Sequence, residues 1–166
     1  MKVDALKRLS VTNRQRVKKI NCRLLKQIAA SALTDLDVAS ADLGIVLVSA
    51  PEIIKLNEQF LRHAGPTDVI AFDYGVGVPP AGGPPNRLKP GLPTLHGEIF
   101  ICVDEAVRQA GKFKTSWQSE AVRYMVPGVV HLLGHDDRRL PDRRKMKRAE
   151  VRRLRELSRR FALSKL

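Results

Sequence analysis

Cysteine is scarce in this chain, which has only Cys22 and Cys102 among its 166 residues. The two lie far apart and inside apolar or helical patterns, so we expect buried free thiols and neither a disulfide nor a metal-binding pair. A scaffold that depends on disulfides is therefore excluded. With 43% apolar residues, a chain of this length can bury the core of one globular domain without such cross-links.

Long apolar runs are also missing. No stretch reaches the roughly eighteen consecutive apolar residues that indicate a transmembrane helix. The first residues, MKVDALKRLSV, have neither the apolar stretch nor the small-residue cleavage site of a signal peptide. These absences predict a cytoplasmic protein with no membrane partner.

Acidic residues are few: 17 Asp and Glu stand against 30 Lys and Arg, which gives a net charge of +13. The excess lies at both ends, with twelve cations and three acids in residues 138–160 and nine cations and one acid in residues 1–27. A solvated helix face is the ordinary explanation of such a run. Arginine, which forms planar two-pronged contacts with phosphate, dominates the run in residues 138–160, so we favour nucleic acid as the partner.

The hydrophobic pattern predicts four strands and about five helices. The expected strands are residues 8–13, 42–49, 67–72 and 97–103. The expected helices are residues 16–33, one that opens at 50–52 with Pro51 in its first turn, one capped by Asp104, and two at 116–134 and 140–161. Trp117 is expected in the core, and Leu154, Leu157 and Phe161 form the apolar stripe of the last helix.

Proline and glycine are concentrated in residues 74–95, which are too rich in both to form a strand interior or a helix. We predict a surface loop there. A lid or binding loop is the less favoured alternative.

The segment VPGVVHLLGHDD, residues 126–137, is the most informative motif. Gly134 can end the helix that carries His131, because glycine accepts the left-handed conformation, and Asp137 can then turn back toward His131. An imidazole and a carboxylate would meet at one point, as in a metal site. A further ligand one turn before His131 would come from position 127, which is Pro127, so the site is one ligand short.

Three segments carry a resemblance to a known family: LNEQFLRHAGPTDVIAFDY from Leu56, HGEIFICVDEAVRQA from His96 and PGVVHLLGHDD from Pro127. In these segments the chain resembles the YbeY endoribonucleases, the metal-dependent maturation factors of bacterial ribosomal RNA. The resemblance implies a single α+β domain over residues 1–166 with a small mixed sheet, a zinc ion held by three side chains, and RNA as substrate.

The third segment is the specific one, and Asp137 occupies the third ligand position of the family pattern. The family pattern is also matched at Gly128, His131, Leu132, Gly134 and Asp136. Pro127 stands where the family has its first metal-binding histidine, and His135 replaces a usual tyrosine.

The resemblance thus implies His131 and Asp137 as metal ligands. His135 is our candidate for the third, because it follows Gly134 in the same turn, and a catalytic zinc wants three protein ligands and an open position. Pro127 should kink the helix, since its ring lacks the N–H donor.

The candidate catalytic residues are His131, Asp137 and Arg62, and Arg62 is the cation among them. Leu61 stands where many family members have an arginine. Arg62 is its neighbour, although a shift of one residue on a helix rotates the side chain by about 100°.

Two functions follow from the resemblance. The first is a single-strand-specific endoribonuclease in rRNA maturation and ribosome quality control, with the ribosome or a pre-ribosomal particle as partner. The second is an RNA-binding ribosome-biogenesis factor without catalysis, which Pro127 supports. A protease of the His-Glu-x-x-His type is excluded, because the chain has Pro-Gly-Val-Val-His there.

Five other polar residues have either a structural role or a place in the site. Thr67 and Asp68 either cap a turn or take part in function, with neither favoured. Glu98 is expected on an edge strand, with a place in the cleft as the alternative. His63 and His96 are expected as surface imidazoles.

Overall fold

Two parallel strands, β2 (Ser40–Val48) and β4 (Thr94–Cys102), form the centre of a four-stranded sheet. In this computed structural model, which describes residues 7–75, 94–134 and 140–166, the strand order is β1-β2-β4-β3. β1 (Lys7–Asn13) runs parallel to β2, whereas β3 (Val69–Asp73) runs antiparallel to β4 at the other edge. The expected mixed sheet is therefore confirmed.

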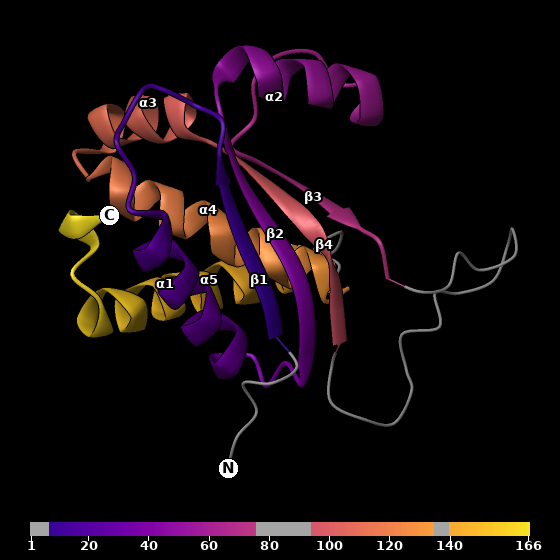
Figure 1. The fold of residues 1–166 in the computed structure, drawn as a ribbon, viewed down its shortest axis with the longest axis vertical. Helices are drawn as coiled ribbons and strands as arrows, with labels where there is room; N and C mark the ends of the chain where they lie inside the picture. The colour runs from indigo at the N-terminus through magenta and orange to yellow at the C-terminus, as the bar shows by residue number, and fades with distance from the viewer. Residues whose placement is uncertain (1–6, 76–93, 135–139) are drawn as a thin grey trace, which may run out of the picture.

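Helices α1 (Cys22–Asp35), α4 (Trp117–Leu132) and α5 (Leu140–Arg160) pack together on one face of the sheet. In Figure 1, α4 and α5 pass behind the strands, and α1 lies beside β1. The main core lies between these helices and the inward residues of the central strands, which alternate along each strand as a half-covered sheet requires. Its members include Leu25, Ile28, Leu43, Ile45, Leu47, Ile99, Ile101, Met125, Val129 and Leu157.

The other face of the sheet is covered only in part. α2 (Ala50–Leu56) continues as a π-helical turn, η2 (Asn57–Leu61), and lies across the upper end of the strands (Figure 1). A second, smaller core forms beneath it from Val46, Val48, Ile53, Ile70, Phe100 and Cys102. The lower half of this face, which we call the open face, has no described helix in front of it.

The remaining elements are short. α3 (Val103–Phe113) follows β4 directly, and its N-cap is Cys102, so the prediction that Asp104 caps this helix is wrong. The Asp104 carboxylate instead accepts a hydrogen bond at 2.6 Å from the backbone N–H of Ala50 and links α3 to α2. A 3₁₀ turn, η3 (Leu163–Lys165), ends the chain. Fold class and element number agree with the sequence-based prediction.

The first helix begins at Cys22, so the prediction that it starts at Arg16 is wrong. Gln15 is buried, and its side chain accepts from the backbone N–H groups of Val17 and Lys18 and donates to the Lys18 carbonyl. These bonds fix an irregular segment before Asn21, whose side chain caps the helix by accepting from the Leu24 N–H at 3.0 Å.

Two further expectations are corrected. β4 begins at Thr94, earlier than the predicted strand and inside the range assigned to the loop, of which residues 76–93 lie outside the described residues. Trp117 is half-buried at the start of α4 and is not a member of the core.

The two cysteines are free thiols, as expected. Cys102 is buried, and burial raises its pKa, whereas Cys22 is half-buried. Within the three described ranges, no helix is both long and apolar enough to span a membrane.

Candidate active site

His131 lies in the last turn of α4, with its side chain exposed. The next residue, Leu132, is buried, and a Cβ at Gly97 would lie only 2.9 Å from its Cδ2 atom. The close approach fixes the end of α4 against the start of β4. Gly134 has φ 85°, and its N–H donates to the His131 carbonyl at 2.9 Å, so the left-handed turn predicted after His131 is present.

The other two expected metal ligands, His135 and Asp137, lie outside the described residues. Their convergence with His131 remains a prediction. Among the residues that are described, no three His, Cys, Asp or Glu side chains gather closely enough to hold a metal. Of the three proposed metal ligands, only His131 is among the described residues. A metal site there would need further ligands from residues 135–139.

Pro127 lies four residues before His131 in α4, on the same side of the helix. Its ring carries no atom that can bind a metal. The helix is continuous through Pro127 from Trp117 to Leu132. Gly128 follows, and a Cβ there would lie 2.8 Å from Ile99 Cγ2, so glycine is what allows this part of α4 to approach β4.

Arg62 ends the π-helical turn in a left-handed conformation, with φ 54° and ψ 30°, and its side chain is exposed. The element that carries Arg62 packs on the α2 side of the sheet, and α4 packs on the opposite side. The edge strand β3 lies between them. Arg62 and His131 are therefore presented from opposite faces of one sheet edge.

Asp68 supports the structural interpretation of the Thr67–Asp68 pair. Its carboxylate accepts from the backbone N–H of Val69 at 2.9 Å and from the Thr67 hydroxyl at 3.3 Å, and its carbonyl accepts from the Cys102 N–H. The pair fixes the beginning of β3 beside the end of β4.

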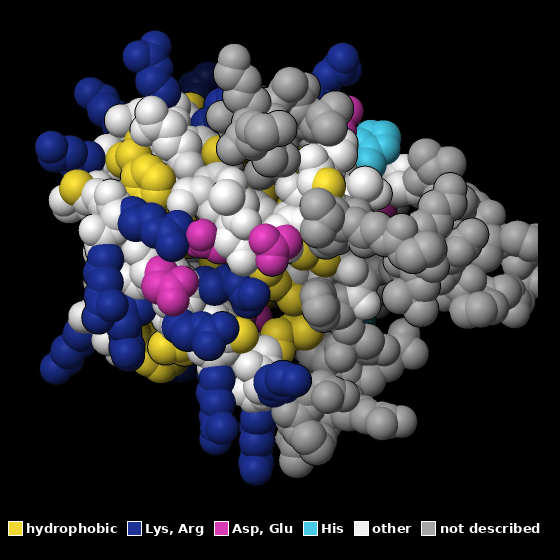
Figure 2. Space-filling model, turned by 90° about the horizontal axis from the view of Figure 1, so that it is seen from below, with side chains coloured by type: hydrophobic (Ala, Val, Ile, Leu, Met, Phe, Trp, Pro, Cys, Tyr) yellow, Lys and Arg dark blue, Asp and Glu magenta, His cyan; other side chains and the backbone are white. Residues whose placement is uncertain are grey.

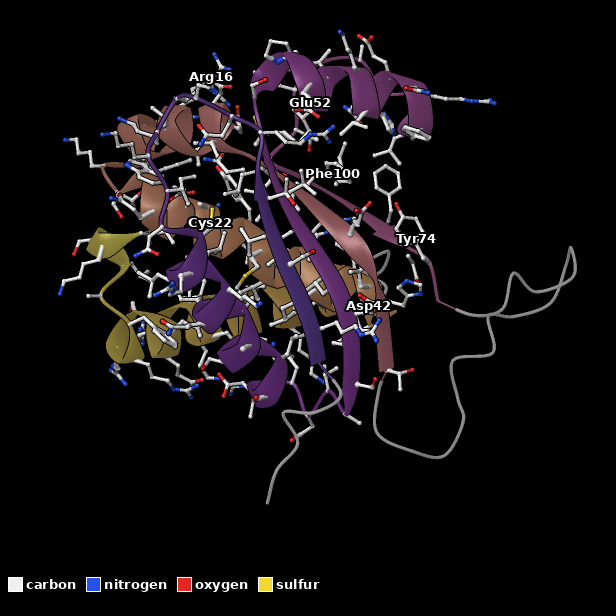
Figure 3. The ribbon with its side chains drawn as sticks, in the orientation of Figure 1. Arg16, Cys22, Asp42, Glu52, Tyr74 and Phe100 are labelled. Carbon is white, nitrogen blue, oxygen red and sulfur yellow. The ribbon has the colours of Figure 1, made fainter. Side chains whose placement is uncertain are left out.

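Glu98 lies on a central strand, so the expectation of an edge strand is wrong. The Tyr74 hydroxyl donates to Glu98 Oε2 at 2.9 Å, and Gly44 opposite leaves room for the carboxylate. Burial, and then the hydrogen bond to Glu98, raise the pKa of the Tyr74 phenol. Figure 3 shows Tyr74 on the same side of the sheet as Phe100 and Asp42.

Sequence reasoning did not single out Tyr74. It belongs to the range assigned to the loop, and its only signal is position: it continues the alternation of Ile70 and Phe72 along β3.

The most basic surface is α5. Val151 is 49% exposed among cations, and a shallow hollow of about 360 Å³ is lined by Val151, Arg144, Lys147 and Arg148. Arg160 at the end of the helix pairs with Asp35 of α1 at 2.8 Å. Figure 2, which views the molecule from below, shows Lys and Arg side chains projecting over much of that face, with few acids between them.

Together, the mixed sheet, the exposed histidine at the end of α4 and the cationic helix define an α+β protein suited to a polyanionic partner. The chain matches the family described as Endoribonuclease YbeY over residues 7–158, and it belongs to that family.

Several relatives carry the name Endoribonuclease YbeY. The protein of Salinibacter ruber is 32% identical over 108 residues, 65% of this chain and 65% of the relative. The protein of Syntrophotalea carbinolica is 32% identical over 131 residues, 79% of this chain and 81% of the relative. That of Myxococcus xanthus is 36% identical over 124 residues, 75% of this chain but 39% of the relative.

Among solved structures that match, one illustrates the similarity in fold. The solution structure of TM1509 from Thermotoga maritima matches with a TM-score of 0.57 and 21% identity, over 91% of this chain and 88% of that chain. This similarity concerns the fold alone, and it agrees with the four-stranded architecture described above.

Proposed function

We propose that this protein is a single-strand-specific, metal-dependent endoribonuclease that acts in the maturation of ribosomal RNA and in ribosome quality control. The proposal places it in the cytoplasm, on the ribosome or a pre-ribosomal particle. The observation that carries it is membership of the endoribonuclease family over residues 7–158, with His131 exposed at the end of α4.

RNA binding is supported by the charge of α5. The cations around the Val151 hollow are exposed, so they can contact phosphates directly. Contacts of this kind release counterions and supply affinity, not sequence choice.

Zinc is the proposed cofactor, with His131, Asp137 and His135 as its ligands. Bound zinc would lower the pKa of a water molecule and so supply a nucleophile, or polarise a phosphate oxygen. The chain's own part is to present His131 from a helix end that Leu132 and Gly97 fix in place. Asp137 and Arg62 complete the proposed catalytic set, with Arg62 as a cation for the substrate phosphate.

The test is the zinc content of the purified protein beside its His131→Ala and Pro127→His variants, with RNA cleavage assayed with and without EDTA on the same samples. We expect about one zinc per chain in the parent, loss of zinc and cleavage in His131→Ala, and cleavage that EDTA abolishes and zinc restores. His135→Ala should also bind zinc more weakly.

The opposite result would be a parent without zinc that gains it in Pro127→His. If such a parent bound RNA equally well with and without EDTA and did not cleave it, the protein would be a non-catalytic RNA-binding factor. That result would overturn the enzyme proposal.

A further inference from the structure

Four aromatic side chains cluster beside the edge strand β3, on the α2 side of the sheet. We call Phe60, Phe72, Tyr74 and His96 the aromatic strip. The rings of Phe60 and Phe72 meet edge to face with centroids 5.3 Å apart, and those of Tyr74 and His96 do so at 5.9 Å. Phe72 also packs edge to face on Phe100, at 5.6 Å, which ties the strip to the smaller core.

The outer members of the strip are uncovered. Phe60 is 55% exposed, Tyr74 is 50% exposed, and His96 is also exposed. Exposed aromatic rings leave apolar area in water without adding to the core, and a group of them marks a binding surface more often than single ones do.

The strip is held in place. Phe72 lies between Phe60 and Phe100, and the Tyr74 hydroxyl donates to Glu98 at 2.9 Å. The Tyr74 backbone N–H also donates to the His96 carbonyl at 2.8 Å, so the two rings stand on paired backbone. Because the rings are already held in place, the protein loses little side-chain conformational entropy when a partner stacks on them.

We propose that the aromatic strip binds the bases of single-stranded RNA by stacking, chiefly on Phe60 and Tyr74. This inference rests on the proposed function, because it assigns to the same substrate a second surface, distinct from the cationic helix α5. Aromatic side chains on which unstacked bases lie are a general means of holding single strands, and they accept any base. Stacking needs unpaired bases, so the strip would favour single strands over duplex.

The net charge of the chain favours RNA over an apolar protein segment as the occupant. Arg62 follows Phe60 by two residues and is exposed, and Arg8 is exposed on β1 on the same side of the sheet. The whole chain carries +13. Asp42, opposite both Arg8 and His96 in the sheet, is an acceptor suited to base amino groups.

The strip also lies near the proposed catalytic residue. β3 is the edge strand, and α4 packs against it from the other side. A strand of RNA that stacks on the strip and crosses the edge of β3 would pass toward the end of α4, where His131 is exposed.

The experiment measures binding of a labelled single-stranded adenosine oligonucleotide of about ten nucleotides, in EDTA to prevent cleavage. Phe60→Ala and Phe60→Leu remove the ring, and Phe60→Tyr keeps it. Phe113→Ala is the matched control, because Phe113 is also 55% exposed but ends α3, away from the strip. Each protein is also tested with an abasic oligonucleotide of equal length, which has the phosphates without the bases.

We expect Phe60→Ala and Phe60→Leu to bind the adenosine oligonucleotide about 5-fold to 150-fold more weakly, as loss of one stacked base predicts. Phe60→Tyr and Phe113→Ala should bind like the parent. None of the four should change binding of the abasic oligonucleotide. Tyr74→Leu should repeat the loss, so the result does not depend on one variant that folds poorly; thermal unfolding checks each protein.

Unchanged binding in Phe60→Ala and Tyr74→Leu would overturn the inference while leaving the proposed function intact, and would point to a protein as the occupant. Equal losses on the two oligonucleotides would also overturn it, since they indicate a backbone contact. A parent that neither binds nor cleaves RNA would refute both.

Discussion

Pro127 is the difference from the family pattern that affects the proposed metal site most directly. Pro127 lies in α4 one turn before His131, at the position where the resemblance implies the first metal-binding histidine. A proline inside a helix lacks the donor N–H and is costly by about 3 kcal/mol or more. The helix nevertheless continues to Leu132, because its buried residues on both sides of Pro127 pack into the main core.

A surface ion pair on α3 gives a pH prediction at this scale. The Arg108 guanidinium donates to both oxygens of Glu105, and this contact is the main reason that the pKa of Glu105 is lowered from 4.5. A lowered native pKa means that the ionised form stabilises the fold above pH 4.5, and that this contribution is lost as the pH falls through the native pKa.

In Arg108→Ala, the free energy of unfolding should therefore fall less than in the parent as the pH is lowered below 4.5. Near neutral pH the substitution should change the free energy of unfolding only slightly, because the arginine is exposed. Urea unfolding across that pH range measures it. Arg23→Ala, which removes an exposed charge from α1, is the control. Parallel pH curves for parent and Arg108→Ala would contradict the assignment.

The contact of α4 with β4 is the decisive one at the level of elements. It brings the helix close to the sheet at Gly128, where a Cβ would lie 2.8 Å from Ile99 Cγ2 and 3.1 Å from its Cδ1. Ile99 is fully buried and cannot move aside. The same contact sets the position of His131, one turn further along the helix.

Gly128→Ala should destabilise the protein. Overpacking of this kind costs about 1–3 kcal/mol, and the better helix propensity of alanine returns up to about 1 kcal/mol. Gly111→Ala on α3 is the control, because nothing lies within 4 Å of a Cβ there, and it should stabilise by about 0.5–1 kcal/mol. Denaturant unfolding of both measures the difference; a stabilised Gly128→Ala would show that the close approach is not tight.

Across the whole molecule, the cationic helix α5 and the aromatic strip are on different surfaces. The cations of α5 belong to the helical side of the sheet, whereas the aromatic strip belongs to the side of α2. A long nucleic acid that contacts both would have to pass around the sheet, for example over the edge strand β3.

Salt dependence tests the role of α5 at this scale. For single-stranded RNA, the logarithm of the affinity falls with the logarithm of salt concentration with a slope of about −0.7 per phosphate contact. Lys147→Ala, in the hollow beside Val151, should make the slope shallower by about 0.7. Lys114→Ala removes the same charge from the end of α3 and should leave it unchanged. Equal slopes in both variants would mean that α5 contributes only net charge.

The sequence by itself determined the periodic features. Alternating and helical apolar patterns predicted four strands and five helices, because burial of one face follows directly from residue spacing. Gly134 predicted the left-handed turn after His131, since only local backbone freedom is involved. Of the apolar stripe predicted for the last helix, Leu157 is fully buried and Leu154 packs beside it, whereas Phe161 packs on the same core just after the helix ends.

Only the tertiary structure decided what depends on contacts between distant residues. Buried Gln15 displaces the start of α1, Glu98 lies on a central strand, and Tyr74 bonds to it across 24 positions of the chain. Arg62 and His131 belong to elements on opposite faces of the sheet, although both are candidates for one catalytic set. Strand order and helix placement create these relations. Spacing along the chain carries no information about them, because packing of the whole core determines which distant segments pair.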